Sequence, residues 1–152
     1  MLKSIHSVKM GTLVYEEISE GYTLREGAVH WTLDASDNKV NMQEMIHRAE
    51  KLYEGLSEFD QQAKARIAGE LVTFKNDFWP EYDEDDPDLD WDRVDAGEYN
   101  VSEERFAACI RLLDIVIKQD HIYCEYDDGE LFGGHRIHAY FDNDYNLIRA
   151  DI

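Results

Sequence analysis

The first third of the chain alternates short hydrophobic runs with glycine-containing breaks. The runs are Thr12–Tyr15, Tyr22–Leu24 and Ala28–Leu33, and Gly21 and Gly27 lie in the breaks between them. Short runs rich in β-branched and aromatic residues, bounded by glycine, are typical of strands that are joined by tight turns. The pattern therefore predicts a three-stranded antiparallel meander.

From Met42 onward the hydrophobic positions recur at helical spacing. Steps of three and four residues continue over residues 42–56 and again over residues 59–78. Such steps place apolar side chains on one face of a helix. Gly55 separates the two segments and Pro80 ends the second. We expect two helices that form an antiparallel pair.

A third helix and a second group of strands are predicted near the C-terminus. Ser102 is a suitable N-cap, and Glu103 and Glu104 place negative charge in the first turn, so we expect a helix that extends to Leu113. The Asp-Gly pair at residues 128–129 favours a tight hairpin turn. The strand-like runs of this region are Ile115–Ile117, Ile122–Tyr126, Leu131–Phe132 with Arg136–Phe141, and Leu147–Ile152.

These elements predict an α+β fold in the order βββ-αα-loop-α-ββββ. Strands at both ends of a chain with helices between them favour an antiparallel sheet with helices packed on one face. A length of 152 residues suits a single domain over residues 1–152.

Charge narrows the range of partners. The chain has 15 Lys and Arg against 34 Asp and Glu, a formal net charge of −19. Nucleic-acid backbones and anionic membrane surfaces require the opposite sign, so neither is an expected partner. A basic protein would be attracted, although the same charge could simply keep the protein soluble.

The acid residues are concentrated in a loop predicted over residues 80–98. This segment holds ten acids and one base, Arg93, and its Pro80 and Pro87 exclude a continuous helix. Aromatic residues are interspersed with the acids, as at binding surfaces; the alternative is a solvated loop. The predicted partner-binding residues are Asp83, Glu84, Asp85, Asp86, Asp88, Asp90, Trp91 and Asp92.

The motifs of common catalytic and metal sites are absent. Asp88, Asp90 and Asp92 resemble the start of a calcium-binding loop, but Arg93 and Tyr99 occupy the positions where that loop requires Gly and Glu. No zinc, nucleophile-elbow or phosphate-loop motif is present. We therefore predict no catalytic residue, no metal ligand and no cofactor.

Cellular location is inferred from hydrophobicity and cysteine use. The sequence contains no apolar run long enough to span a membrane and no secretory signal. Cys109 and Cys124 lie within apolar patterns and are interpreted as buried thiols rather than a disulfide. These features favour the cytoplasm.

Three stretches of the sequence are similar to a bacterial family. They are Leu71–Trp79, Ser102–Phe106 and Asp128–His135. Together they resemble the family catalogued as domain of unknown function twenty-two sixty-two. The resemblance implies a bacterial cytoplasmic protein and assigns no reaction. The hairpin residues that carry it are Asp128, Gly129, Glu130 and His135.

The leading functional hypothesis is an acidic protein-binding module. One form of it is an immunity protein that occludes the active cleft of a basic toxin, for example a nuclease. That comparison rests on general character and is an analogy. The alternative is a small metal-dependent hydrolase with a site near residues 128–135. A third interpretation is a scaffold domain of a larger assembly.

Overall fold

The computed structural model describes residues 2–25, 27–79, 87 and 90–152. The strands of this part of the chain form one eight-stranded sheet, in which they lie in sequence order. Neighbouring strands are antiparallel except the central pair β4 and β5, which is parallel. The strands are β1 (Ser4–Ser7), β2 (Gly11–Glu16), β3 (Gly21–Leu24), β4 (His30–Asp34), β5 (Arg111–Ile117), β6 (Ile122–Asp127), β7 (Ile137–Phe141) and β8 (Leu147–Asp151).

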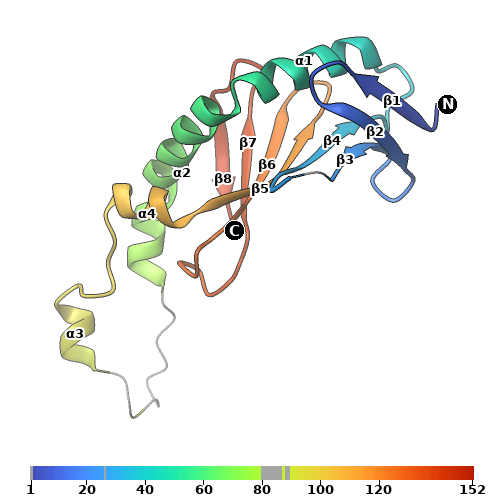
Figure 1. Cartoon of the computed structure of the whole chain (residues 1–152). Coiled ribbons are helices and arrows are strands. Elements are labelled where there is room, and N and C mark those ends of the chain that lie inside the picture. Colours follow the sequence, from blue (N-terminus) through green and yellow to red (C-terminus); the bar gives the residue numbers. More distant parts are fainter. Residues whose placement is uncertain (1, 26, 80–86, 88–89) are drawn as a thin grey trace.

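Two long helices cover one face of this sheet (Figure 1). They are α1 (Met42–Glu54) and α2 (Leu56–Phe78), and the side chain of Asn41 caps the first by accepting hydrogen bonds from two backbone N–H groups. Helices on a single sheet face confirm the predicted α+β architecture. The expected antiparallel pairing of these helices is wrong. Gly55 alone separates them, which is too short a link to reverse the chain, and they follow one another in an arc across the sheet.

The core lies between the sheet and these helices. Side chains of successive strand residues point to opposite faces, so every second residue of the central strands enters this layer. Burial of each large apolar side chain contributes roughly 1.5–3 kcal/mol, which makes this layer the main source of stability. Among its most buried members are Trp31, Leu33, Met45, Leu52, Ile67, Ile115, Ile117 and Cys124. The remaining positions of the same strands form the uncovered face of the sheet.

Three elements differ from the sequence prediction. Strand β1 carries a weak strand signal but pairs with β2, with Ile5 opposite Leu13. Arg111 begins β5 and does not continue the preceding helix, α4 (Glu103–Cys109), because Ile110 is already extended. Leu131 lies in the turn region between β6 and β7 and not in a strand.

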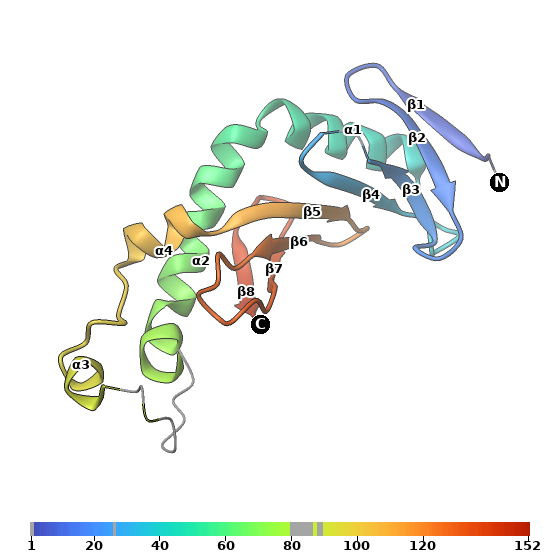
Figure 2. The same cartoon turned by 60° about the horizontal axis from the view of Figure 1, so that its bottom comes forward.

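The described residues 90–98 form a projection from the main body. It contains the short helix α3 (Trp91–Asp95), which both views place away from the sheet (Figures 1 and 2). The predicted loop over residues 80–98 therefore includes one helical segment in its described part. Across the described residues, no helix combines the length and hydrophobicity that crossing a membrane requires.

Candidate protein-docking site

Three sequence stretches meet around the buried ring of Phe132. The side chain of Phe132 is fully buried. Its ring centroid lies 6.0 Å from those of Phe74 and Trp79, at the end of α2, and 5.9 Å from that of Phe106 on α4. Aromatic pairs at these distances contribute about 0.5–1.5 kcal/mol beyond their burial. The cluster fixes α2, α4 and the 128–135 loop to one another at the base of the projection.

The carboxylate of Asp128 organises the loop that supplies this ring. It is 1% exposed and accepts hydrogen bonds from the backbone N–H groups of Glu130, Phe132 and Gly134, at 3.0, 2.9 and 3.0 Å. The expected tight hairpin is therefore a longer loop wrapped around a carboxylate. Gly129 is required because a Cβ atom there would lie 2.2 Å from the carbonyl oxygen of Cys109.

The predicted hairpin residues thus have distinct roles. Asp128 and Gly129 shape the loop, and His135 places its ring 5.5 Å from that of Trp79. Glu130 adopts a positive φ of 67° within the loop. Within the described parts of the chain, no three His, Cys, Asp or Glu side chains are grouped so as to hold a metal ion. The hydrolase alternative stays a prediction.

Lys75 and Asn76 fasten the returning end of the projection to α2. Lys75 is buried and donates to the carbonyl oxygen of Tyr99, and this burial lowers the pKa of its amine. The side-chain amide of Asn76 donates to the Val101 carbonyl at 3.0 Å and accepts from the Val101 N–H at 2.9 Å. α2 ends at Phe78, and these contacts bring Tyr99 and Val101 back to the same helix. The residues that directly follow the segment 80–98 are therefore fixed to the helix that precedes it.

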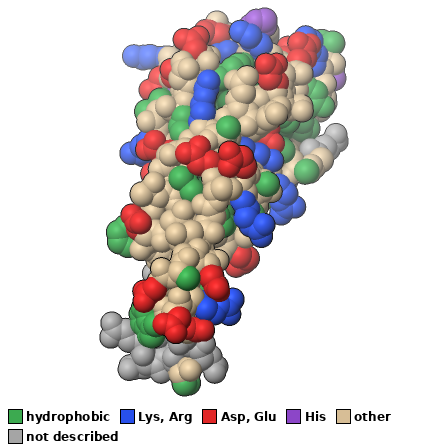
Figure 3. All heavy atoms as spheres, turned by 90° about the vertical axis from the view of Figure 1, so that its left-hand side faces the viewer, with side chains coloured by type: hydrophobic (Ala, Val, Ile, Leu, Met, Phe, Trp, Pro, Cys, Tyr) green, Lys and Arg blue, Asp and Glu red, His purple; other side chains and the backbone are tan. Residues whose placement is uncertain are grey.

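The projection presents acids to solvent. The carboxylate of Asp90 caps α3 by accepting hydrogen bonds from the backbone N–H groups of Asp92 and Arg93, at 3.0 and 3.4 Å. Arg93 forms an ion pair with Glu98, which raises the pKa of its guanidinium. Asp92 and Asp95 are exposed. Figure 3 shows acidic side chains gathered on this projection.

The predicted partner-binding residues divide into two groups. Asp90, Trp91 and Asp92 lie on α3 or at its start, and Trp91 is 45% exposed. Trp91 is therefore an exposed aromatic residue beside Asp90 and Asp92, and the binding role of these residues stays a prediction. The remaining residues lie outside the described part of the chain: Asp83, Glu84, Asp85, Asp86 and Asp88.

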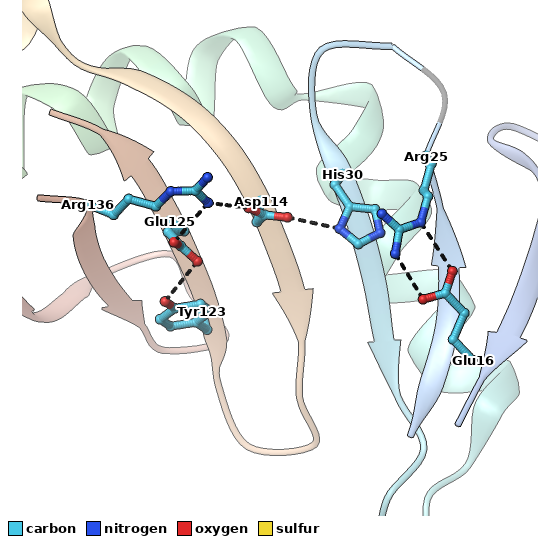
Figure 4. Close-up of polar contacts among 7 residues, drawn as sticks. All are labelled: Glu16, Arg25, His30, Asp114, Tyr123, Glu125 and Arg136. Atoms are coloured by element: carbon cyan, nitrogen blue, oxygen red, sulfur yellow. Dashed lines mark hydrogen bonds and ion pairs between the residues drawn. The ribbon is translucent and has the colours of Figure 1, made fainter. Parts of the chain in front are cut away.

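A polar network on the uncovered sheet face escaped the sequence prediction (Figure 4). Nδ1 of His30 lies 2.9 Å from Oδ1 of Asp114 on the parallel neighbouring strand. Arg136 lies between two carboxylates, with Nη1 at 3.0 Å from Glu125 and 3.7 Å from Asp114. The hydroxyl of Tyr123 donates to Glu125 at 3.3 Å. These contacts connect β4, β5, β6 and the start of β7 through their side chains.

Two further contacts extend this network along the face. Arg25 donates from two nitrogens to the two carboxylate oxygens of Glu16, at 3.1 and 3.0 Å, and chiefly for that reason the pKa of Glu16 is lowered. The hydroxyl of Tyr123 lies 2.6 Å from Nδ1 of His138, and burial raises the pKa of this phenol. Glu16, Asp114 and Glu125 of this face thus each have a basic partner, whereas Asp92 and Asp95 of the projection are exposed.

The sequence carried only a faint signal of this face. Polar residues occupy alternate positions of β6 and β7, as the predicted strands require, but alternation does not reveal which strands become neighbours. The contact between His30 and Asp114 depends on the parallel pairing of β4 with β5. That pairing joins residues 84 positions apart in the sequence.

Comparison with known proteins gives a family and no further relatives. No curated protein and no solved structure matches the chain. A family sequence profile matches residues 9–152, which includes the three stretches around Phe132 and the whole projection. The chain therefore belongs to the family DUF2262, described as an uncharacterized protein conserved in bacteria.

Proposed function

We propose that this chain is a protein-binding module that docks a basic protein through the acidic segment 80–98. The observation that carries the proposal is the concentration of acids in one segment of the sequence, whose neighbouring residues are anchored to the main body. Spread over a surface of 9413 Å², a net charge of −19 would place only about two charges on an interface of about 800 Å². Ten acids and one base give the segment a net charge of −9.

The physical consequence is electrostatic attraction over distance. A concentrated field of one sign raises the rate at which an oppositely charged partner associates, and salt weakens the effect. The contacts of Trp79, Lys75 and Asn76 support this role, because they fix the residues on either side of the segment: Trp79 packs against Phe132, and Lys75 and Asn76 bond to residues 99 and 101. Trp91 adds exposed aromatic surface of the kind that stabilises interfaces.

The chemistry of the partner follows from the sign of the charge. A protein with a cationic cleft, such as an enzyme that binds nucleic acid, would accept an acidic projection in place of its substrate. An immunity protein that neutralises a toxin nuclease is the specific form of this proposal.

The test is affinity capture with charge-reversal variants. Tagged wild-type protein, the double variant Asp92→Lys with Asp95→Lys, and the control Glu17→Lys with Glu20→Lys would each be immobilised and exposed to lysate of the source cells. Both variants change the net charge equally, and all four positions are exposed. We expect wild type and control to retain the same basic protein at low salt, and the projection variant to lose it. Equal retention by all three would contradict the proposal.

A further inference from the structure

The apolar stripe of α2 extends beyond the sheet that covers it. Ile67 and Leu71 are 0% and 6% exposed, but Phe74 and Phe78, on the next turns, are 39% and 61% exposed. These two rings are four residues apart on the same helix face, with centroids 5.2 Å apart. Phe74 touches the buried ring of Phe132, whereas Phe78 continues past it. The end of α2 therefore presents a rigid aromatic patch, defined here as Phe74 and Phe78.

Two exposed acids lie near this aromatic patch on α2. Glu70 and Asp77, on the same part of α2, are exposed. The one base among residues 70–79 is Lys75, which is buried and bonded to the carbonyl oxygen of Tyr99. The acidic segment begins directly after this helix. An apolar surface with an acidic rim is complementary to an apolar side chain that is flanked by cations.

We propose that the aromatic patch anchors an amphipathic helix of a basic partner, with its apolar stripe on Phe74 and Phe78 and its Lys or Arg residues toward the acids. This inference rests on the proposed function and adds a division of roles. The acids accelerate association, and the two rings slow dissociation, because buried aromatic contacts dominate the stability of an interface. An exposed helix end supported by a packed cluster suits this role, since little ordering is needed on binding.

Two synthetic helical peptides provide the probe. One consists of lysine and leucine with the leucines along a single face, and the other has the same charge with serine in place of every leucine. Binding of each to the full-length protein would be measured by titration calorimetry. We expect wild type to bind the lysine–leucine peptide about tenfold more tightly than the lysine–serine peptide. This difference is at the lower end of what an interface anchor contributes.

Three variants separate the contributions. Phe78→Ser removes the more exposed ring and leaves Phe74 on Phe132, so the fold is retained. Ile18→Ser is the matched control, because Ile18 is a fully exposed apolar residue elsewhere on the surface. We expect Phe78→Ser to abolish the preference for the leucine peptide and Ile18→Ser to preserve it. The charge variant Asp92→Lys with Asp95→Lys should lower the affinity for both peptides by the same factor.

The outcomes distinguish this inference from the proposed function. If the charge variant weakens both peptides while Phe78→Ser keeps the leucine preference, the aromatic anchor is wrong and the acidic docking surface stands. The anchor is also wrong if wild type binds the two peptides equally. If neither peptide loses affinity in the charge variant, the acidic docking surface itself is contradicted.

Discussion

The uncovered face of the sheet and the acidic projection both carry many charges, but they arrange them differently. On the sheet face, Glu16 has Arg25 as its partner, and Asp114 and Glu125 share Arg136. The segment 80–98, whose described part forms the projection, contains ten acids and one base, and that base pairs with Glu98. Charges with internal partners fix strands and loops in place, whereas an excess of one sign produces a field that can reach another molecule.

This difference separates structural from functional carboxylates. A carboxylate with internal partners contributes to the free energy of folding, and its removal should be detected without any ligand. A carboxylate in the acidic excess contributes little to folding and should affect only association. The four predictions that follow test this distinction, from the largest expected effect on stability to the smallest.

Removal of the Asp128 carboxylate should have the largest effect. Asp128→Ala would leave three backbone N–H groups without an acceptor beside the buried ring of Phe132. Each unsatisfied buried donor costs about 1–3 kcal/mol, and partial rearrangement makes about 3 kcal/mol the expected total. Urea denaturation measures this loss. Asp144→Ala, in an exposed turn, is the control and should cost no more than about 0.5 kcal/mol. Equal stability of the two variants would contradict this account of the loop.

Removal of the cation shared on the sheet face should have a moderate effect. Arg136→Gln would leave the carboxylates of Asp114 and Glu125 close together without their cation. Because Arg136 is 56% exposed, we expect a loss of no more than about 1 kcal/mol. The loss should decrease as salt is added. Denaturation at low and high salt tests this, with Arg105→Gln as a control of equal charge; a loss that is independent of salt would argue against an electrostatic origin.

The ion pair between Glu16 and Arg25 should be visible in acid. The folded-state pKa of Glu16 lies below its ordinary value of 4.5, so the pair stabilises the fold above that pH. This contribution is lost as pH falls through the lowered pKa. The stability difference between wild type and Arg25→Gln should therefore be constant above about pH 4.5 and shrink below it. A difference that persists unchanged in strong acid would rule out the pairing as its cause.

Charge reversal on the projection should have the smallest effect on folding. Asp92→Lys with Asp95→Lys alters two exposed side chains in a region of acidic excess. We expect the free energy of unfolding to change by less than about 0.5 kcal/mol. The contrasting variant is Glu16→Lys on the sheet face. It places a second cation beside Arg25 and should lower the free energy of unfolding. If the projection variant were the less stable of the two, the proposed distinction would fail.

The sequence predicted those parts of the fold that depend on local pattern. Ser102 does cap its helix, accepting from the Arg105 N–H at 3.2 Å, and α1 and α2 occupy the expected residues. The fold class was correct because alternation and helical spacing are local properties. The relation between α1 and α2 was wrong because it depends on the single residue Gly55 and on the sheet beneath them.

The candidate site was predicted less completely, for a related reason. The acidic segment is visible as composition, but its anchors at Lys75 and Asn76 bond to residues 24 and 25 positions away. The Asp-Gly pair at residues 128–129 suggested a tight turn because nothing local shows that the Asp128 carboxylate would be buried. Phe74 and Phe78 read as core positions, since the pattern does not show where the sheet ends.

The most direct test of the central claim is the salt dependence of association with the captured basic protein, followed by stopped-flow fluorescence. We expect the wild-type rate constant to fall steeply with ionic strength. At low salt, Asp92→Lys with Asp95→Lys should slow association at least about tenfold, while Glu17→Lys with Glu20→Lys changes it less than about twofold. Equal slowing by the two double variants would show that only net charge matters and would contradict docking through the projection.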